Sequence, residues 1–183
     1  MGAESPKRRP ALLVLDMVNP FSFPGDGASL RAARRIAATV GKLARSHRRR
    51  GAPCIYVSDN FGQWQSDFRA LLEMAAATKG AVILEWIRPA QGDLFVLKPK
   101  HSAFYQTPLP SLLESRGVEA LTICGIETDS CVLATAMDAH MREYDVRVPS
   151  NAAASASAAR HRAALLLMRH SDIDTRAWKP GQR

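Results

Sequence analysis

Short apolar runs alternate with longer amphipathic segments along nearly the whole chain. Continuous apolar runs are typical of strands buried on both faces, and apolar residues at helical spacing are typical of helices that cover such strands. The segments that we expect to be strands are residues 11–15, 53–58, 94–97, 121–124 and 144–148. This order predicts an α/β fold, a three-layer α/β/α doubly wound parallel sheet with helices on both faces.

The segments between the strands are predicted to be helices and loops. The expected helices are residues 28–50, 68–79, 109–115, 158–169 and a segment that begins near Thr128. Residues 80–86 are ambiguous, residues 150–157 are expected to be a loop, and residues 173–176 a last edge strand. We expect residues 1–9 to be a mobile N-terminal tail and residues 10–183 a single domain, because neither a repeat nor a linker interrupts the pattern.

The charge balance is basic, but its distribution does not favour nucleic acid. The 183 residues include 25 Lys and Arg against 17 Asp and Glu, a formal net charge of +8, and 46% of the residues are hydrophobic. Much of the excess lies in residues 7–9 and at the basic end of the first helix, where cations complement the helix dipole. Aromatic residues are not interleaved with these cations, so we expect no nucleic-acid partner.

Three cysteines are present, an odd number without the spacing of a metal site or a disulfide framework. Cys54 and Cys124 fall in predicted buried strands and are expected to be inert core thiols. A reducing cytoplasm suits this pattern. No apolar run in the sequence approaches the length of a membrane span, so no membrane partner is expected.

Cys131 differs from the other two because it is predicted to lie in the first turn of a helix, directly after a strand and Gly125. Thr128 and Asp129 offer cap-type side chains there. The positive end of the helix dipole and its free N–H groups favour a thiolate and can hold an oxyanion. The alternative is a small buried cysteine on a helix face.

Two further reactive side chains follow predicted strands. Asp16 ends the first strand and Lys98 follows the strand of residues 94–97. The carboxyl ends of parallel strands lie at one edge of a sheet, so Asp16, Lys98 and Cys131 are expected to converge in one crevice. A carboxylate, an ammonium and a thiol together suit nucleophilic catalysis.

The motifs around these three residues resemble those of the isochorismatase-like cysteine hydrolases, a superfamily that includes nicotinamidases and N-carbamoylsarcosine amidohydrolases. The resemblance covers residues 11–175 and is found in LVLDMVNPF around Asp16, LKPKHSAFYQTPL around Lys98 and GIETDSCVLATAMDA around Cys131. The later segments VPSNAAAS and HRAAL are also similar to the family.

The resemblance implies a hydrolase that acts on carbon–nitrogen bonds other than peptide bonds. Asp16 would be the general base, Lys98 would hold Asp16 and favour the thiolate, and Cys131 would attack a carbonyl carbon to form a thioester. It also implies a cis peptide bond between Ile126 and Glu127, with the backbone N–H groups of Glu127 and Cys131 as the oxyanion hole.

Departures from the family narrow the function. The Asp-x-His metal motif of nicotinamidases is replaced by Asp59-Asn60-Phe61, and the five histidines lack ligand spacing, so neither a metal nor another cofactor is expected. Val18 and Glu127 stand where many relatives have glutamine and alanine. Members that cleave the vinyl ether of isochorismate do not need the cysteine, so its presence favours amide-type hydrolysis.

The expected partner is a small-molecule amide or carbamoyl compound. Loop aromatic residues at the same edge are candidates for the pocket wall, although each also suits packing: Phe21, Trp64, Phe104 and Tyr105. The resemblance further implies a homo-oligomer, a dimer or a tetramer. Two alternatives stay open, a vinyl ether hydrolase and a non-catalytic basic binding protein on the same fold.

Overall fold

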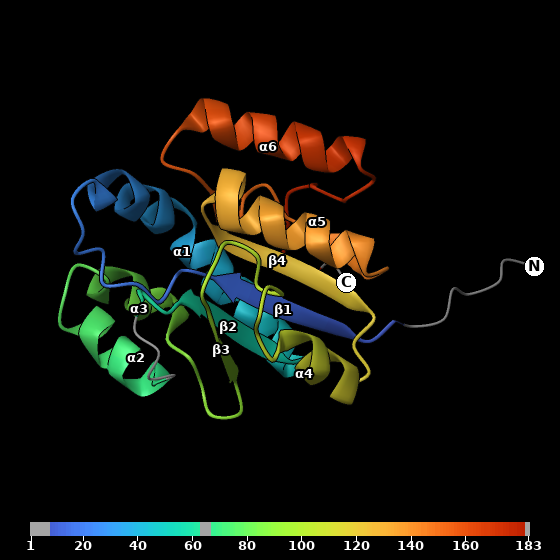
Figure 1. Cartoon of the computed structure of the whole chain (residues 1–183), viewed down its shortest axis with the longest axis horizontal. Helices are drawn as coiled ribbons and strands as arrows, with labels where there is room; N and C mark the ends of the chain where they lie inside the picture. The colour runs from blue at the N-terminus through green and yellow to red at the C-terminus, as the bar shows by residue number, and fades with distance from the viewer. Residues whose placement is uncertain (1–7, 63–66, 182–183) are drawn as a thin grey trace, which may run out of the picture.

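The apolar runs form a parallel sheet in the order β3-β2-β1-β4-β5, with the short β6 paired to β4 (Figure 1). The computed structural model describes residues 8–62 and 67–181. Its strands are β1 (Pro10–Leu15), β2 (Cys54–Asp59), β3 (Leu94–Lys98), β4 (Ala120–Ile126), β5 (Asp145–Arg147) and β6 (Ala153–Ala154). Its helices are α1 (Asp26–Arg49), α2 (Phe68–Ala76), α3 (Ala81–Ile87), α4 (Leu109–Ser115), the π-helical turn η1 (Thr128–Val132), α5 (Leu133–Met141) and α6 (Ala158–His170).

The central strand β1 is buried along almost its whole length. Residues 11–15 are each at most 1% exposed, because helices cover both faces of the sheet. Leu15, the last residue of β1, pairs with Val57 of β2 on one side and with Gly125 of β4 on the other. The residues that follow these strands are therefore brought to one edge.

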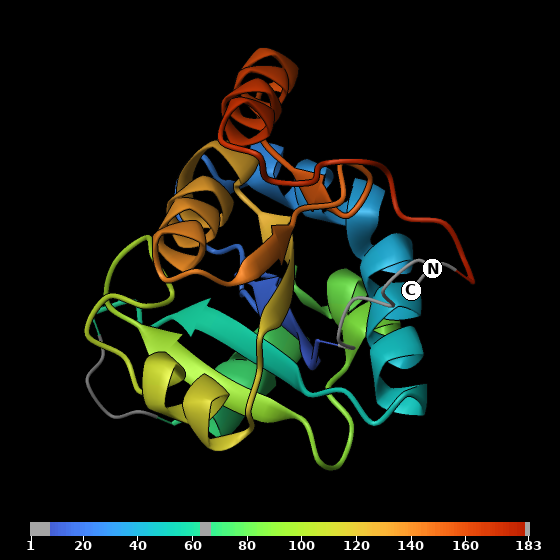
Figure 2. The same cartoon turned by 90° about the vertical axis from the view of Figure 1, so that its right-hand side faces the viewer.

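Two hydrophobic cores lie on the two faces of the sheet. Leu12 and Val14 of β1 point toward the core under α1, α2 and α3. Leu13 and Leu15 point toward the core under α4, α5 and α6. Figure 2 shows α1 on one side of the sheet and α4 and α5 on the other. This alternation of side chains gives the three layers that the sequence predicted.

Several element boundaries differ from those expected. Residues 80–86, which were ambiguous in the sequence, are mostly the helix α3. The expected loop 150–157 contains the two residues of β6. The predicted edge strand 173–176 is reduced to one bridge between Asp174 and Arg147, since β5 offers only three residues for pairing.

The predicted tail of residues 1–9 is too long at its C-terminal end. The carbonyl of Arg9 accepts N–H bonds from Glu119 and Ala120, at 2.9 and 3.2 Å, and Arg8 forms an ion pair with Asp145 at 3.4 Å. Residues 1–7 lie outside the described part. No helix in the described ranges is long and apolar enough to cross a bilayer.

Candidate active site

Asp16 is placed at the centre of the site by the end of β1. Its backbone turns into the left-handed region (φ 53°), and its side chain is buried, at 8% exposure for the residue. One carboxylate oxygen, Oδ1, accepts the Asp59 N–H at 3.0 Å. The other, Oδ2, is 3.0 Å from the Lys98 ammonium nitrogen. The carboxylate is therefore held from two sides.

Lys98 reaches Asp16 across an intervening strand. It ends β3, which pairs with β2 and not with β1, so the side chain must bridge roughly 10 Å between strands. It is fully buried, and its Nζ lies 3.9 Å from Asp59 Oδ2 and 3.4 Å from Cys131 Sγ. A long cationic side chain thus joins three strand ends in one cluster.

Cys131 sits in the π-helical turn that opens the helix after β4, directly beyond the cis Ile126–Glu127 peptide bond. The expected side-chain caps are not formed. Instead, Thr128 Oγ1 is 2.9 Å from His161 Nδ1, and Asp129 forms an ion pair with Arg160 at 3.3 Å. Both residues attach the turn that contains Cys131 to α6.

The surroundings of Cys131 favour its protonated thiol. Burial, and then the charge of Asp16, raise the pKa of Cys131 to about 12, although Lys98 acts in the opposite direction. Burial also raises the pKa of Asp16, against the opposing charge of Lys98. Burial alone would lower the pKa of Lys98, but the charges of Asp16 and Cys131 outweigh it and raise the pKa. With its pKa raised in this way, the thiol would need a base to take its proton, which is the role that the resemblance implies for Asp16.

The backbone around the turn leaves a candidate oxyanion donor. The N–H groups of Ser130 and Val132 both donate to the Glu127 carbonyl, at 3.1 Å. In the part of the chain that the structure describes, the Cys131 N–H does not donate to the Glu127 carbonyl. The Glu127 side chain turns toward the loop after β6, where Oε2 accepts the Ala156 N–H at 2.6 Å. The assignment of the Glu127 and Cys131 N–H groups as the oxyanion hole stays a prediction.

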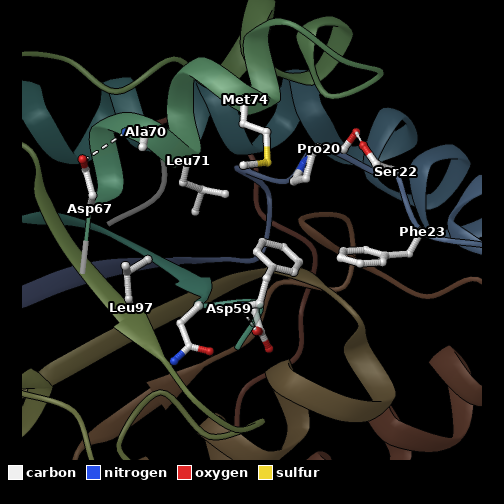
Figure 3. A pocket seen from close by; sticks show the side chains of 11 residues that line it. Pro20, Ser22, Phe23, Asp59, Asp67, Ala70, Leu71, Met74 and Leu97 are labelled. Atoms are coloured by element: carbon white, nitrogen blue, oxygen red, sulfur yellow. Dashed lines mark hydrogen bonds between the residues drawn. The ribbon is translucent and has the colours of Figure 1, made fainter. Parts of the chain in front are cut away.

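A cavity of about 270 Å³, shown in Figure 3, shares one residue with this cluster. Asp59 belongs to both, because its carboxylate lines the cavity while its Oδ2 faces Lys98. Most of the wall is apolar, and the rings of Phe23 and Phe61 stack with centroids 5.6 Å apart. The lining residues are Pro20, Ser22, Phe23, Asp59, Asn60, Phe61, Asp67, Ala70, Leu71, Met74 and Leu97.

Of the four predicted pocket-wall residues, the three that the structure describes do not line this cavity. Phe21 and Phe104 are 1% and 3% exposed and belong to the two cores, where Phe104 lies beneath the Arg142 guanidinium. Tyr105 is 48% exposed and does not line the cavity. Trp64 lies outside the described residues. Among the described residues, the aromatic wall comes from Phe23 and Phe61, in the loops that follow β1 and β2.

His101 was missed by the sequence analysis. Its Nδ1 lies 3.8 Å from Cys131 Sγ and 3.2 Å from Ser130 Oγ. A search for ligand spacing along the chain could not find it, because thirty residues separate His101 from the cysteine. His101 lies three residues after Lys98, which was expected at the site, and this closeness in sequence could have indicated that His101 lies there too.

The residues around Asp59 do not fit a metal centre of the Asp-x-His type. Phe61 occupies the position of the histidine, and its ring is stacked on Phe23. The Asp59 Oδ1 accepts the Phe61 N–H at 2.7 Å, while Oδ2 faces the Lys98 ammonium, a cation that would repel a metal ion. No group of three or more His, Cys, Asp or Glu side chains suited to a metal occurs among the described residues.

Comparison with known families and structures agrees with this geometry. A family model described as the isochorismatase domain matches residues 10–177. The chain belongs to the isochorismatase family. Membership makes it a hydrolase and confirms the resemblance that the three motifs indicated.

Individual relatives of the family cover nearly the whole chain. An isochorismatase family protein of Bacillus subtilis is 37% identical over 158 residues, 86% of this chain and 87% of the relative. A probable inactive nicotinamidase of Arabidopsis thaliana is 31% identical over 92% of each chain. The structure of N-carbamoylsarcosine amidase from Thermoplasma acidophilum aligns with a TM-score of 0.72 and 27% identity, and covers 94% of this chain and 99% of that one. The predicted fold class is thereby confirmed.

Proposed function

We propose that this protein is a metal-independent cysteine hydrolase of a small amide or carbamoyl compound, with Asp16, Lys98 and Cys131 as its catalytic residues. The observation that supports this most is the single cluster in which Lys98 Nζ lies 3.0 Å from Asp16 Oδ2 and 3.4 Å from Cys131 Sγ. A nucleophile, a base and a cation in mutual contact are the requirements of acyl transfer.

The first half-reaction follows from the resting charges. Asp16, a carboxylate made more basic by burial, takes the thiol proton as Cys131 Sγ adds to the carbonyl carbon. Lys98 stabilises the negative charge that moves between the carboxylate and the sulfur. When the C–N bond breaks, Asp16 returns the proton to the leaving nitrogen, and ammonia or an amine departs. The acyl group stays on sulfur as a thioester.

The cavity supports a small substrate with an apolar body. Its volume of about 270 Å³ suits a compound of modest size, and its wall combines the Phe23 and Phe61 rings with Leu71 and Met74. The charged side chains that line it, Asp59 and Asp67, are acidic. Neutral amides are therefore favoured over carboxylate-bearing ones, and the first amides to test are benzamide and aliphatic amides of similar size.

The relatives support carbon–nitrogen hydrolysis without identifying the substrate. The Thermoplasma acidophilum relative is named as an amidase, whereas the Arabidopsis thaliana relative is named as a probable inactive nicotinamidase. Membership in the family therefore does not by itself give nicotinamidase activity. The replacement of the metal-binding histidine by Phe61 also argues against it.

The experiment that tests the proposal measures ammonia release from a panel of small amides and ureido compounds. We expect turnover of at least one neutral amide, unchanged by EDTA, and its loss in both Cys131→Ala and Asp16→Asn. A Cys54→Ala variant, which removes a core thiol outside the cluster, should retain activity. If Cys131→Ala retained activity, the amide proposal would be wrong, and cleavage of a vinyl ether by Cys131→Ala would favour that alternative.

A further inference from the structure

His101 occupies the solvent side of the reactive sulfur. Lys98 contacts the Cys131 sulfur and the Asp16 carboxylate, and Lys98 and Asp16 are 0% and 8% exposed, whereas His101 is an exposed residue. Its Nδ1 is 3.8 Å from Cys131 Sγ. The thiol is thus bordered by two different kinds of base, one buried and one open to water.

The loop that holds His101 is fixed to the helix that follows the nucleophile. Next to His101, Ser102 Oγ donates to Asp138 Oδ2 at 2.7 Å, and the Ala103 N–H donates to Thr135 Oγ1 at 3.0 Å. Thr135 and Asp138 both belong to α5, which continues directly from the turn of Cys131. His101 and Cys131 therefore share one support, and their proximity does not depend on a free loop.

The second half-reaction needs a base that water can reach. Once the sulfur is acylated, a water molecule must approach the acyl carbon from solvent. Asp16 lies behind the sulfur and is already engaged by Lys98 and by the Asp59 N–H, at 3.0 Å each. Imidazole is the commonest general base in enzymes, and His101 lies where that water would arrive.

We propose, on the basis of the proposed function, that His101 is a further catalytic residue, the general base for hydrolysis of the thioester on Cys131. With its Nδ1–H donated to Ser130 Oγ, at 3.2 Å, the ring presents Nε2 to the water. Nε2 takes one proton while the hydroxide adds to the acyl carbon. The C–S bond then breaks, the carboxylic acid leaves, and the imidazolium returns a proton to the sulfur.

The test separates the two half-reactions with p-nitrophenyl acetate. This ester would form a thioester of the same kind on Cys131, and it releases p-nitrophenol, whose phenolate is coloured. In His101→Ala we expect the initial burst to stay within about threefold of the wild type. The steady-state rate should fall by about 100-fold, the lower end of the usual contribution of a general base. Acetylated protein, mapped to the peptide of Cys131, should accumulate. His101→Gln should behave in the same way, and free imidazole should accelerate deacylation of His101→Ala.

The control is His140→Ala, which removes an exposed histidine at the end of α5 and should leave both phases unchanged. The inference would be overturned by a His101→Ala variant with wild-type steady-state turnover, or by one that loses the burst without accumulating the thioester. Failure of the proposed function is distinct. In that case the wild type itself would show no burst that depends on Cys131, and the role of His101 would fall with it.

Discussion

Lys98 places a positive charge in the interior, next to the carboxylates of Asp16 and Asp59. Its side chain is fully buried, 3.0 Å from Asp16 and 3.9 Å from Asp59. A buried ion of this kind persists only with close partners, because water no longer stabilises it. The proposed catalytic cluster is therefore also a structural ion pair, which has measurable consequences for stability.

Removing the ammonium alone should destabilise the fold. Because an uncompensated carboxylate would stay buried, we expect Lys98→Met to lower the free energy of unfolding by about 3 kcal/mol. In urea denaturation the double variant Asp16→Asn/Lys98→Met should recover most of this loss, yet remain inactive. Arg8→Met, which breaks the exposed pair with Asp145, should change stability by less than about 1 kcal/mol. If the double variant lost as much unfolding free energy as the two single variants together, the energetic coupling between Asp16 and Lys98 would be contradicted.

The reactivity of Cys131 should follow its raised pKa. Only the thiolate reacts with iodoacetamide, and the pKa of Cys131 is about 12. The alkylation rate of the free protein should therefore rise about tenfold per pH unit from pH 7 to 10, without levelling off near the pKa of an ordinary thiol. Because the charge of Asp16 contributes to the raised pKa, Asp16→Asn should react faster at a given pH. Peptide mapping gives both rates, and a plateau near pH 8.5 would refute this description.

At the scale of the elements, the site depends on how closely β1 and β4 approach. Gly125 pairs with Leu15, the residue before Asp16, and its backbone has φ +118°. A Cβ atom added at Gly125 would overlap the Leu15 carbonyl oxygen. The glycine thus allows the strand of the nucleophile to lie directly against the strand of the base.

Gly125→Ala should separate these two strand ends. We expect a loss of about 3 kcal/mol in unfolding free energy, from the overlap together with the strained backbone. Gly51→Ala is the matched control, since Gly51 also has a positive φ, +68°, but no atom within 4 Å of the added Cβ. Its cost should be about 1 kcal/mol. Equal losses in the two variants, measured by chemical denaturation, would show that the close approach is unimportant.

The sequence predicted strands better than short or irregular helices. The apolar runs at 11–15, 53–58 and 121–124 became the largely buried strands β1, β2 and β4, whereas β3 is only partly buried. The seven residues of α3 were ambiguous, since a short apolar segment fits a helix or a strand equally well. The π-helical form of the turn at residues 128–132 had no sequence signal, because it is set by contacts of Thr128 and Asp129 with α6.

At the scale of the whole molecule, several arginines are paired with aspartates. Arg8, Arg48, Arg142, Arg147 and Arg160 each form an ion pair with an aspartate, and the pairs are distributed over several elements. A continuous phosphate-binding surface requires cations that are clustered and available. These five arginines are engaged by carboxylates, and we expect the remaining excess of positive charge, a formal +8, to give only weak attraction for nucleic acid.

Nucleic-acid binding should accordingly be weak. With a 20-base-pair duplex at 0.15 M NaCl, we expect no change in fluorescence anisotropy at about 10 µM protein. This concentration lies within the range of ordinary non-specific dissociation constants, so a protein that binds DNA non-specifically would give a signal. The comparison sample is the same protein at 0.02 M NaCl, where residual attraction should appear. Tight binding at 0.15 M with a steep salt dependence would instead favour the basic binding protein.

The site could be predicted only in part because its residues are brought together in different ways. Asp16, Lys98 and Cys131 follow strands, and the topology of a parallel sheet places such residues at one edge. His101 depends on the path of a loop, and the cavity wall combines two loops with Leu71 and Met74 of α2. Contacts that depend on the path of a loop produce no regular pattern of residue positions in the sequence.

The central claim is that the acyl group of the substrate passes through Cys131. Rapid quenching during turnover of the best amide, followed by mass spectrometry, tests this most directly. We predict a transient mass increase equal to the acyl group, located on the peptide that contains Cys131, and neither adduct nor ammonia release in Cys131→Ala. Ammonia release by Cys131→Ala at the wild-type rate, with no adduct on the wild-type protein, would contradict the claim.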